Sequence, residues 1–383
     1  MAQANQKRLS TAVLLSSGEQ FSPYFGGALA RWTYEVYRWL VPEMDVRVFG
    51  FPTAPGDRYP MAHGSSGVWR ACRVMERVPG LRRYEEEVWI RSLFSRVRRL
   101  EVVHIHNRPQ WVGLLRRLGY GGAIVLHLQN DHLGHWTGEM LDGLASQLQG
   151  VAVCSGYLRD RFAGRSAALA GKTRVVFNGV NTELFSPREE LRENRTIFFV
   201  GRFDPEKGVL ELVRAFARVL QERPESRLVI GGTTGFGTHK ETAYVQEVRR
   251  EAGLLEARNP GCVRFAGYLD HDRDLPQYFQ KAAVFACPSL FQEPFGLVNA
   301  EAMACATPVV GSNRGGIPEV VGDAGILVNP EDARELAWAL SLMLGDPDRR
   351  AELGQASLER AREMFDWRVI AKEWWEFLGE ISD

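Results

Sequence analysis

The chain of 383 residues lacks several features that would place it in a specialised class. It has no run of about 18 apolar residues, which excludes a transmembrane helix. Its five cysteines are scattered and odd in number, so we expect reduced thiols in a cytoplasmic protein, not a disulfide framework or a zinc site. Its first residues lead only into a short apolar run at 12–15, which indicates a first strand and not a signal peptide.

Net charge is also absent, but the two halves of the chain differ in sign. Residues 1–180 carry nine more basic than acidic residues, and the remainder carries the opposite excess. Much of the basic excess lies in residues 70–99, where nine arginines accompany Trp69, Trp89 and Phe94. Two interpretations stand: a solvated helix face, or a surface for an anionic acceptor or for the inner face of a membrane. No nucleic-acid motif appears, so we expect no nucleic-acid partner.

Short apolar runs alternate with amphipathic segments along the chain. A first series has a helix at 29–40 and strands at 11–16, 45–51, 102–106, 123–128, 151–154 and 173–177. After the polar stretch 186–195, a second series has helices at 209–222, 333–344 and 348–364 and strands at 196–200, 227–230, 263–266, 282–287 and 307–311. This alternation predicts an α/β protein with two Rossmann-like domains, each with a parallel sheet, joined by a linker at 186–195.

Two acidic residues, Glu293 and Glu301, stand eight positions apart after the apolar strand 283–286. Glu293 falls on a loop, and Glu301 falls inside a helix whose neighbours are small or apolar. Loops at the carboxyl ends of strands are where open α/β sheets bind ligands, and a carboxylate accepts hydroxyl hydrogen bonds well. The pair therefore indicates a ligand rich in hydroxyl groups.

A second candidate site is Gly201-Arg202-Phe203-Asp204-Pro205-Glu206-Lys207-Gly208, which follows a strand and opens a helix. Such a junction presents free backbone N–H groups to an anion, and Arg202 and Lys207 add two positive charges. A phosphate clamp and a solvated turn are equally compatible with this segment alone.

The N-terminal half offers weaker signals. Gly26 and Gly27 occupy the first strand-to-helix loop but lack the full G-x-G-x-x-G pattern, so a flexible turn is an equal alternative. His127 ends a strand, and His104 and His106 lie near a neighbouring strand end. A three-histidine metal site can be imagined, but the spacing fits no metal template well. We expect no metal and no cofactor, an expectation that rests on the family resemblance given in the next paragraphs.

The stretch from Glu293-Pro-Phe-Gly through Glu301-Ala-Met-Ala, with Thr307-Pro-Val-Val and Gly315-Gly-Ile-Pro-Glu, closely resembles the retaining, nucleotide-sugar-dependent glycosyltransferases of family 4. The resemblance is strong over residues 195–330 and weaker over 10–185. It implies the GT-B fold, in which residues 1–185 form an acceptor-side domain and 195–364 bind the nucleotide sugar. The last helix, at 365–383, would cross back to pack on the N-terminal domain.

The resemblance also implies roles for the candidate residues. Arg202 and Lys207 would hold the diphosphate and stabilise it as a leaving group, and Glu301 would hold the ribose. Glu293 would hold the transferred sugar, which His127 would contact from the N-terminal domain. Further donor contacts would come from Gly26, Gly27, Gly231, Tyr268, Leu269, Phe295, Gly296 and Leu297.

The expected reaction moves a hexose from a nucleoside-diphosphate sugar to an acceptor hydroxyl of a glycan, a lipid or a small molecule. UDP-sugar is the first expectation for the donor and GDP-sugar the second. Two alternatives remain at this point: a nucleotide-sugar epimerase on the same fold, and a non-catalytic sugar-nucleotide-binding or coat protein.

Overall fold

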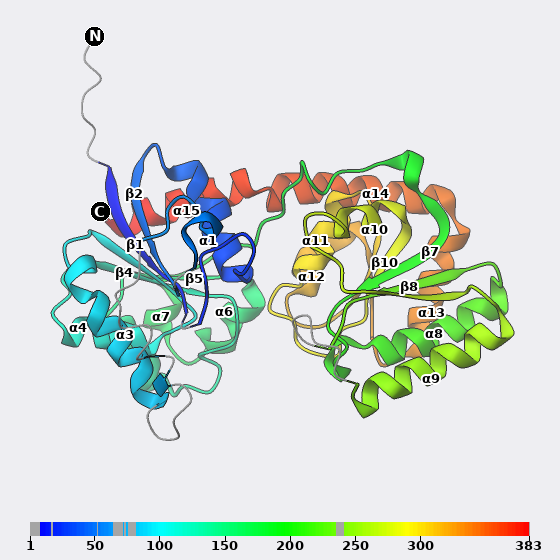
Figure 1. Ribbon diagram of the computed structural model, residues 1–383, viewed down its shortest axis with the longest axis horizontal. Helices are drawn as coiled ribbons and strands as arrows, with labels where there is room; N and C mark the ends of the chain where they lie inside the picture. Colours follow the sequence, from blue (N-terminus) through cyan, green and yellow to red (C-terminus); the bar gives the residue numbers. More distant parts are fainter. Residues whose placement is uncertain are drawn as a thin grey trace, which may run out of the picture. The chain divides into compact units, whose positions relative to one another are not determined.

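The computed structural model describes residues 8–16, 18–51, 53–63, 72, 74–75, 82–234 and 241–382. The chain divides into two compact units (Figure 1): unit 1 comprises residues 1–177 with 367–383, and unit 2 comprises residues 178–366. Each unit contains one six-stranded sheet in which every strand pair is parallel. The α/β class with two Rossmann-like units is thereby confirmed.

Unit 1 has the strand order β2-β1-β3-β4-β5-β6. Its elements are β1 (Leu9–Leu14), α1 (Ala28–Leu40), β2 (Met44–Phe49), η1 (Pro55–Asp57), α3 (Arg82–Val97), β3 (Val102–His106), α4 (Gln110–Arg117), β4 (Ala123–Leu128), α5 (Gly138–Ala145), β5 (Gly150–Val153), α6 (Gly156–Ala163), α7 (Ala167–Ala170), β6 (Thr173–Val175) and α15 (Trp367–Ser382). Ser155 caps α6, because its hydroxyl accepts a hydrogen bond from the amide of Leu158 at 3.2 Å.

Unit 2 has the strand order β12-β11-β10-β7-β8-β9. Its elements are η2 (Glu189–Leu191), β7 (Glu193–Val200), η3 (Pro205–Lys207), α8 (Val209–Glu222), β8 (Arg227–Gly231), α9 (Ala243–Arg258), β9 (Val263–Gly267), α10 (Leu275–Lys281), β10 (Ala282–Cys287), α11 (Leu297–Ala304), β11 (Val309–Ser312), α12 (Ile317–Val321), η4 (Gly322–Ala324), β12 (Ile326–Val328), α13 (Ala333–Gly345), α14 (Pro347–Arg360) and the π-helical turn η5 (Ala361–Phe365). The order reverses between β7 and β10, which is the position where doubly wound sheets bind their ligands.

In unit 1, α1 and α15 pack together over one face of the sheet. Trp32 on α1 and Trp374 on α15 are fully buried, and their rings meet edge-on at 5.0 Å. The indole N–H of Trp374 also donates a hydrogen bond to the hydroxyl of Tyr37 on α1. The last helix therefore packs on the N-terminal unit, as the family resemblance implied.

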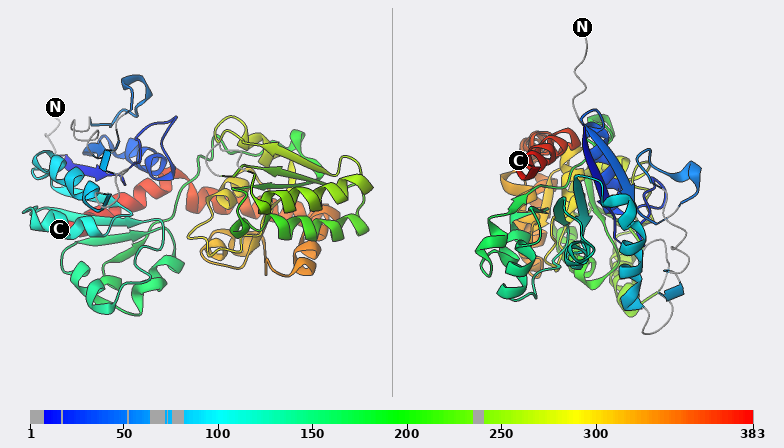
Figure 2. Two further views of the ribbon diagram at one scale, coloured as in Figure 1. Left: turned by 60° about the horizontal axis from the view of Figure 1, so that its bottom comes forward. Right: turned by 90° about the vertical axis from the view of Figure 1, so that its left-hand side faces the viewer.

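In unit 2, helices cover both faces of the sheet (Figure 2). Ile197 and Phe199 on β7 share a core with α8 and α13, whereas Phe198 packs against Phe279 of α10 on the other face. Alternate side chains of a strand point to opposite faces, so a buried run such as 197–199 indicates a sheet covered on both sides.

The boundary between the units differs from the predicted linker. The division falls after Phe177, and the stretch 186–195 belongs to unit 2, where β7 already begins at Glu193. Arg192 anchors this stretch: its guanidinium donates to the carbonyl of Ala282 at 2.6 Å and to the hydroxyl of Thr307 at 2.8 Å. Hydrogen bonds therefore hold this polar segment in unit 2. A hydropathy pattern cannot predict such bonds, so the segment resembles a linker in the sequence.

The basic region is described only in part. Trp69, Arg70, Arg73 and Arg77 lie outside the described residues, as do the side chains of Arg82 and Arg83. On α3, Trp89 is buried and stacks on Phe51, so this aromatic residue belongs to the core and not to a membrane-facing surface.

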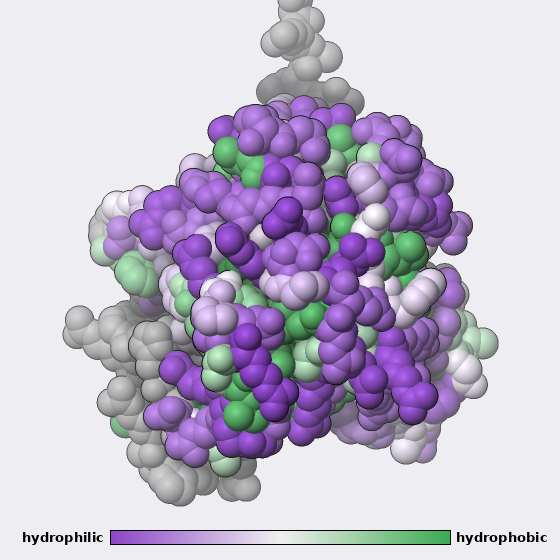
Figure 3. Space-filling view, turned by 90° about the vertical axis from the view of Figure 1, so that its right-hand side faces the viewer, coloured by the Kyte–Doolittle hydropathy of each residue, from purple (hydrophilic) through white to green (hydrophobic). Residues whose placement is uncertain are grey.

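The described residues include no helix that is both long and apolar enough to cross a bilayer. The face of the molecule in Figure 3 is mostly hydrophilic, and its hydrophobic residues form small separate groups. The five cysteines, all among the described residues, are buried and form no disulfide bond.

Candidate functional site

Two strand-end loops of unit 2 meet at the point where the strand order reverses. Lys207 follows β7, Glu293 follows β10, and these strands are neighbours in the sheet. The ammonium group of Lys207 forms an ion pair with Oε1 of Glu293, which also accepts a hydrogen bond from the hydroxyl of Ser289 at 3.1 Å. Both charged side chains are largely but not fully buried, at 23% and 14% exposed. The pair sits at the ligand-binding edge of the sheet.

The turn that carries Lys207 is fixed to the loop that carries Glu293. The backbone N–H groups of Leu290 and Phe291 both donate to the carbonyl of Glu206, at 2.8 and 3.1 Å. Gly208 adopts a left-handed conformation with φ of 69°, and a Cβ placed there would lie 1.9 Å from the carbonyl oxygen of Pro288. Only glycine allows this approach, so the two loops behave as one rigid element.

A third loop, between β11 and α12, supports Glu293 from the other side. The amide of Gly316 donates to the carbonyl of Glu293 at 2.7 Å, and Gly315 donates to the side chain of Gln292 at the same distance. Gly315 has φ of 63°, and a Cβ there would lie 2.2 Å from the carbonyl oxygen of Glu293. The Gly315-Gly316 pair therefore sets the position of the Glu293 loop.

The residues after Glu293 contribute mainly through the backbone. Gly296 is the left-handed residue that precedes α11, with φ of 82°, and the helix begins at Leu297. The ring of Phe295 is buried and meets Phe365 edge-on at 5.6 Å. The first N–H groups of α11 thus lie beside Glu293, where a helix terminus presents unpaired donors.

Glu301 lies inside α11 with only 3% of its side chain exposed. Its Oε1 is 2.7 Å from Nε2 of His271, while its Oε2 is buried and has no hydrogen-bond partner among the described residues. A buried carboxylate oxygen without a donor is costly, so it is available to a ligand hydroxyl.

His271 is a site residue that the sequence did not reveal. It lies in the β9–α10 connection, thirty residues before Glu301, and its Nδ1 is 2.7 Å from a carboxylate oxygen of Asp272. The ring of Phe185 packs edge-on against it at 5.2 Å. The only available signal was its position three residues after Tyr268, near a segment already expected to contact the nucleotide.

Arg202 and Lys207 are placed differently. Arg202 is 51% exposed and pairs with Asp204 at 2.9 Å, whereas Lys207 pairs with Glu293. Behind this loop, Cys287 is buried. Burial, aided by the negative charge of Glu293, raises the pKa of Cys287 to about 12, so its thiol stays protonated and is a poor nucleophile.

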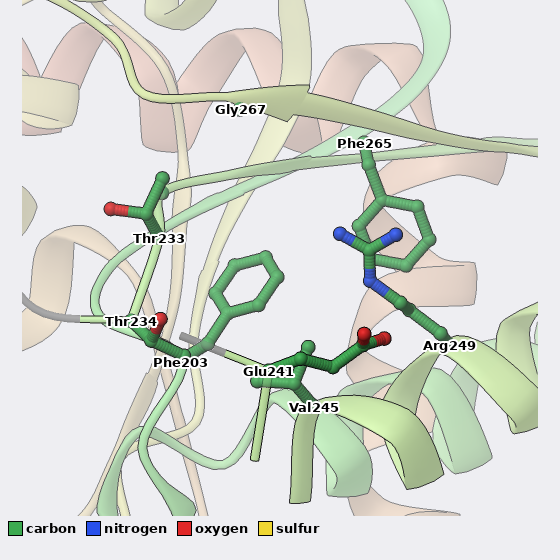
Figure 4. Close-up of a pocket in the computed structure, with 9 residues that line it drawn as sticks. Phe203, Thr233, Thr234, Glu241, Val245, Arg249, Phe265 and Gly267 are labelled. Carbon is green, nitrogen blue, oxygen red and sulfur yellow. The ribbon is translucent and has the colours of Figure 1, made fainter. Parts of the chain in front are cut away.

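The carboxyl ends of β8 and β9 enclose a cavity of about 400 Å³ (Figure 4). Its lining includes Gly232 and Thr233. In Figure 4, Thr233 lies across from Phe265 and Arg249 of α9, whose guanidinium lies over the ring at 5.7 Å from its centre. Gly231 packs against Leu269, and its carbonyl accepts from the amide of Gly201. This hydrogen bond joins the strand end beside the cavity to the loop that carries Arg202.

Leu269 and Tyr268 border a second cavity of about 400 Å³, between the sheet and α10. Tyr268 is 63% exposed, so its ring is free to cover a ligand.

In unit 1, the candidate residues Gly26, Gly27 and His127 lie in closely packed surroundings. Gly27 precedes α1, and its amide donates to the carboxylate of Glu19 at 2.7 Å; a Cβ on Gly26 would lie 2.4 Å from the carbonyl oxygen of Ser22. His127 is fully buried, and the centre of its ring lies 4.3 Å from that of Trp32. Burial lowers the pKa of its imidazole to about 3. Its ring is a neutral core group, and the expected contact with a sugar stays a prediction.

The profile of the family described as glycosyl transferases group 1 matches residues 181–360. Alpha-maltose-1-phosphate synthase of Mycolicibacterium smegmatis is 34% identical over 314 residues, which cover 73% of this chain and 79% of that protein. The chain belongs to the glycosyl transferases of group 1. Another relative, spore coat protein SA of Bacillus subtilis, is 29% identical over 76% of this chain and 80% of its own length.

Solved structures share the fold of this chain. The structure of Anabaena Alr3699/HepE in complex with UDP matches 97% of this glycosyltransferase and 100% of that chain, with a TM-score of 0.74 and 22% identity. Sucrose-phosphate synthase from Thermosynechococcus elongatus matches 98% of this chain and 99% of its own chain, with a TM-score of 0.73 and 24% identity. These neighbours confirm the GT-B fold that the resemblance implied.

Proposed function

We propose that this group 1 glycosyltransferase is a retaining enzyme of family 4 that moves a hexose from a nucleoside-diphosphate sugar to an acceptor hydroxyl. The observation that supports it best is the placement of Lys207, Glu293 and Glu301 along one edge of one sheet. A cation for a diphosphate, a carboxylate for a sugar and a carboxylate for a ribose are the groups such a donor needs.

The roles follow from the surroundings of each side chain. Lys207 and Arg202 stabilise the departing diphosphate, and their positive charge takes the place of a divalent metal ion. Glu293 and the N-terminal amides of α11 hold the sugar, whereas Glu301 offers its unpartnered Oε2 to a ribose hydroxyl. The base lies toward Gly231, Tyr268 and Leu269.

The reaction runs on one face of the sugar. The bond from the anomeric carbon to the diphosphate oxygen breaks, and the acceptor oxygen forms its new bond on the same face while a diphosphate oxygen takes its proton. Burial raises the pKa of the Cys287 thiol near this site, which argues against a covalent intermediate on that sulfur.

UDP-sugar is our first choice of donor, because the structure of Anabaena Alr3699/HepE was solved with UDP. A thermal-shift screen of UDP-, GDP- and ADP-sugars on the full chain tests this, since a ligand that binds the native state raises the melting temperature. We expect one nucleotide class to stabilise the wild type and to lose its effect in Lys207→Met. Arg227→Met is the matched control, because Arg227 is exposed at the amino end of β8, the opposite edge of the sheet.

Two outcomes would redirect the proposal. Binding of a donor without release of nucleoside diphosphate in the presence of any acceptor would indicate a non-catalytic protein. Release of an epimerised sugar without an acceptor would indicate an epimerase.

A further inference from the structure

Three histidines converge in the interior of unit 1. His104 and His106 are two residues apart on β3 and therefore point to the same face of the sheet. On β4, His127 is the direct parallel partner of His106. All three are fully buried beneath α1 and α15, with ring centres 4.1 to 5.6 Å apart.

Four ring nitrogens of this cluster have no hydrogen-bond partners among the described residues. These atoms are Nε2 of His104, Nδ1 of His106 and both ring nitrogens of His127. Candidate ligand nitrogens from the three rings all lie within 4.8 Å of one another. A buried polar atom without a partner destabilises the fold, so the cluster is unfavourable unless something binds to it.

The two other ring nitrogens, by contrast, lie within hydrogen-bond distance of hydroxyl groups. Thr33 Oγ1 lies 2.9 Å from Nε2 of His106 and donates its own proton to the carbonyl of Leu29 at 2.8 Å. Since that hydroxyl must accept from His106, Nε2 carries the proton and Nδ1 presents a free lone pair to the cluster. The hydroxyl of Tyr37 lies 3.0 Å from Nδ1 of His104, which leaves Nε2 as the nitrogen without a partner. Metal-binding histidines show this division, with one nitrogen on the ion and the other fixed by a hydrogen bond.

We propose that His104, His106 and His127 form a transition-metal site, for which Zn²⁺ is the first choice. Imidazole suits zinc, copper, nickel and cobalt, whereas magnesium and calcium prefer oxygen ligands. Three protein ligands leave a fourth position for water or hydroxide, and hydroxide reduces the charge that the core must accommodate. Tetrahedral zinc places its ligand nitrogens about 3.4 Å apart, so the rings need to close by no more than about 1.4 Å.

The site is separate from the chemistry proposed for unit 2. Its ligands lie on β3 and β4, and the groups that orient them lie on α1, with Trp374 of α15 bonded to Tyr37. A bound ion would therefore fix the C-terminal helix to the N-terminal sheet. The expected effect of the metal is on the stability of unit 1, and it is independent of which donor the enzyme uses.

The test uses the full chain without a polyhistidine tag. The protein is stripped with a chelator and titrated with Zn²⁺, while the melting temperature is recorded. Co²⁺ is titrated in parallel, and its visible absorption is recorded. We expect one equivalent to bind, a rise in melting temperature of about 5–10 °C at a hundredfold excess over Kd, and a visible spectrum typical of tetrahedral Co²⁺.

His106→Gln and His127→Gln should each abolish the rise and the spectrum, whereas His135→Gln, which changes an exposed histidine, should keep both. Metal analysis of the wild type as purified covers the case in which a core variant does not fold: close to one equivalent of zinc per chain supports the site. No stoichiometric metal, with no rise on titration, would overturn it and leave a buried water as the partner of the free nitrogens. A rise that survives in both core variants would also overturn it.

Discussion

Glu301 offers the sharpest test of how the donor is held. Its side chain is 3% exposed, Oε1 is engaged by His271, and Oε2 has no partner within the described chain. Glu301→Gln keeps the shape of the side chain but removes its charge and turns one acceptor into a donor. A hydrogen bond to a charged group contributes about 1.5–3 kcal/mol, so the affinity for free nucleoside diphosphate should fall about 10- to 100-fold.

Glu293→Gln should behave in the opposite way. Glu293 is the ion-pair partner of Lys207, so its neutralisation leaves that ammonium group free for the diphosphate. We expect the affinity for nucleoside diphosphate to stay the same or to rise. Turnover should fall, because the sugar loses an interaction that strengthens in the transition state.

Calorimetric titration of both variants with UDP, and with GDP if UDP does not bind, separates these roles. Glu359→Gln, an exposed change on α14, is the control and should bind as the wild type does. A loss of affinity in Glu293→Gln together with full affinity in Glu301→Gln would show that the two roles are reversed.

His271 extends this prediction to a residue that acts through Glu301. His271→Asn should weaken binding of nucleoside diphosphate, and the double variant with Glu301→Gln should be no weaker than Glu301→Gln alone. Residues that share one hydrogen-bond network show such coupling, whereas independent contacts add. Additive losses would mean that His271 contacts the ligand independently.

Three further predictions concern the loops, the fold and the role of divalent ions. Gly315→Ala should lower transfer at least tenfold, because its Cβ would lie 2.2 Å from the carbonyl of Glu293 at positive φ, while Gly121→Ala, which has open space around it, should not change the rate. Arg192→Met should destabilise unit 2 by about 2–4 kcal/mol in urea unfolding, since it leaves buried carbonyls and the hydroxyl of Thr307 without their donor; an unchanged midpoint would contradict this. Added Mg²⁺ or Mn²⁺ should leave the transfer rate within about twofold, as Arg202 and Lys207 supply the charge at the diphosphate; tenfold activation would refute that role.

Much of the fold was readable from the sequence because its elements follow simple periodicities. Helix α8 was expected at 209–222 and has those bounds, since its apolar residues repeat at helical spacing and Gly208 marks its start. Strand β10 was expected at 282–287 and is buried along its whole length, as a continuous apolar run predicts. Strand β7 begins three residues earlier than expected, because Glu193, Asn194 and Arg195 are exposed and carry no hydrophobic pattern.

The site was readable in part, for a related reason. Glu293 and Glu301 are close in sequence, so a loop and a helix were enough to place them together. The ion pair of Glu293 with Lys207 and the contact of Glu301 with His271 join residues 86 and 30 positions apart, and only the order and register of the strands bring them together. The histidine cluster has the same origin, because the pairing of His106 with His127 depends on the register of β3 and β4.

The central claim is that the protein transfers a sugar from a nucleoside diphosphate with retention of configuration. NMR of the full chain with an α-linked UDP-sugar and a mixture of hydroxyl acceptors tests it most directly. The account predicts release of UDP together with a new α-anomeric signal, and loss of both in Lys207→Met but not in Arg227→Met. A β-anomeric product would contradict the retaining mechanism. No release of nucleoside diphosphate from any UDP-, GDP- or ADP-sugar would contradict the assignment as a transferase.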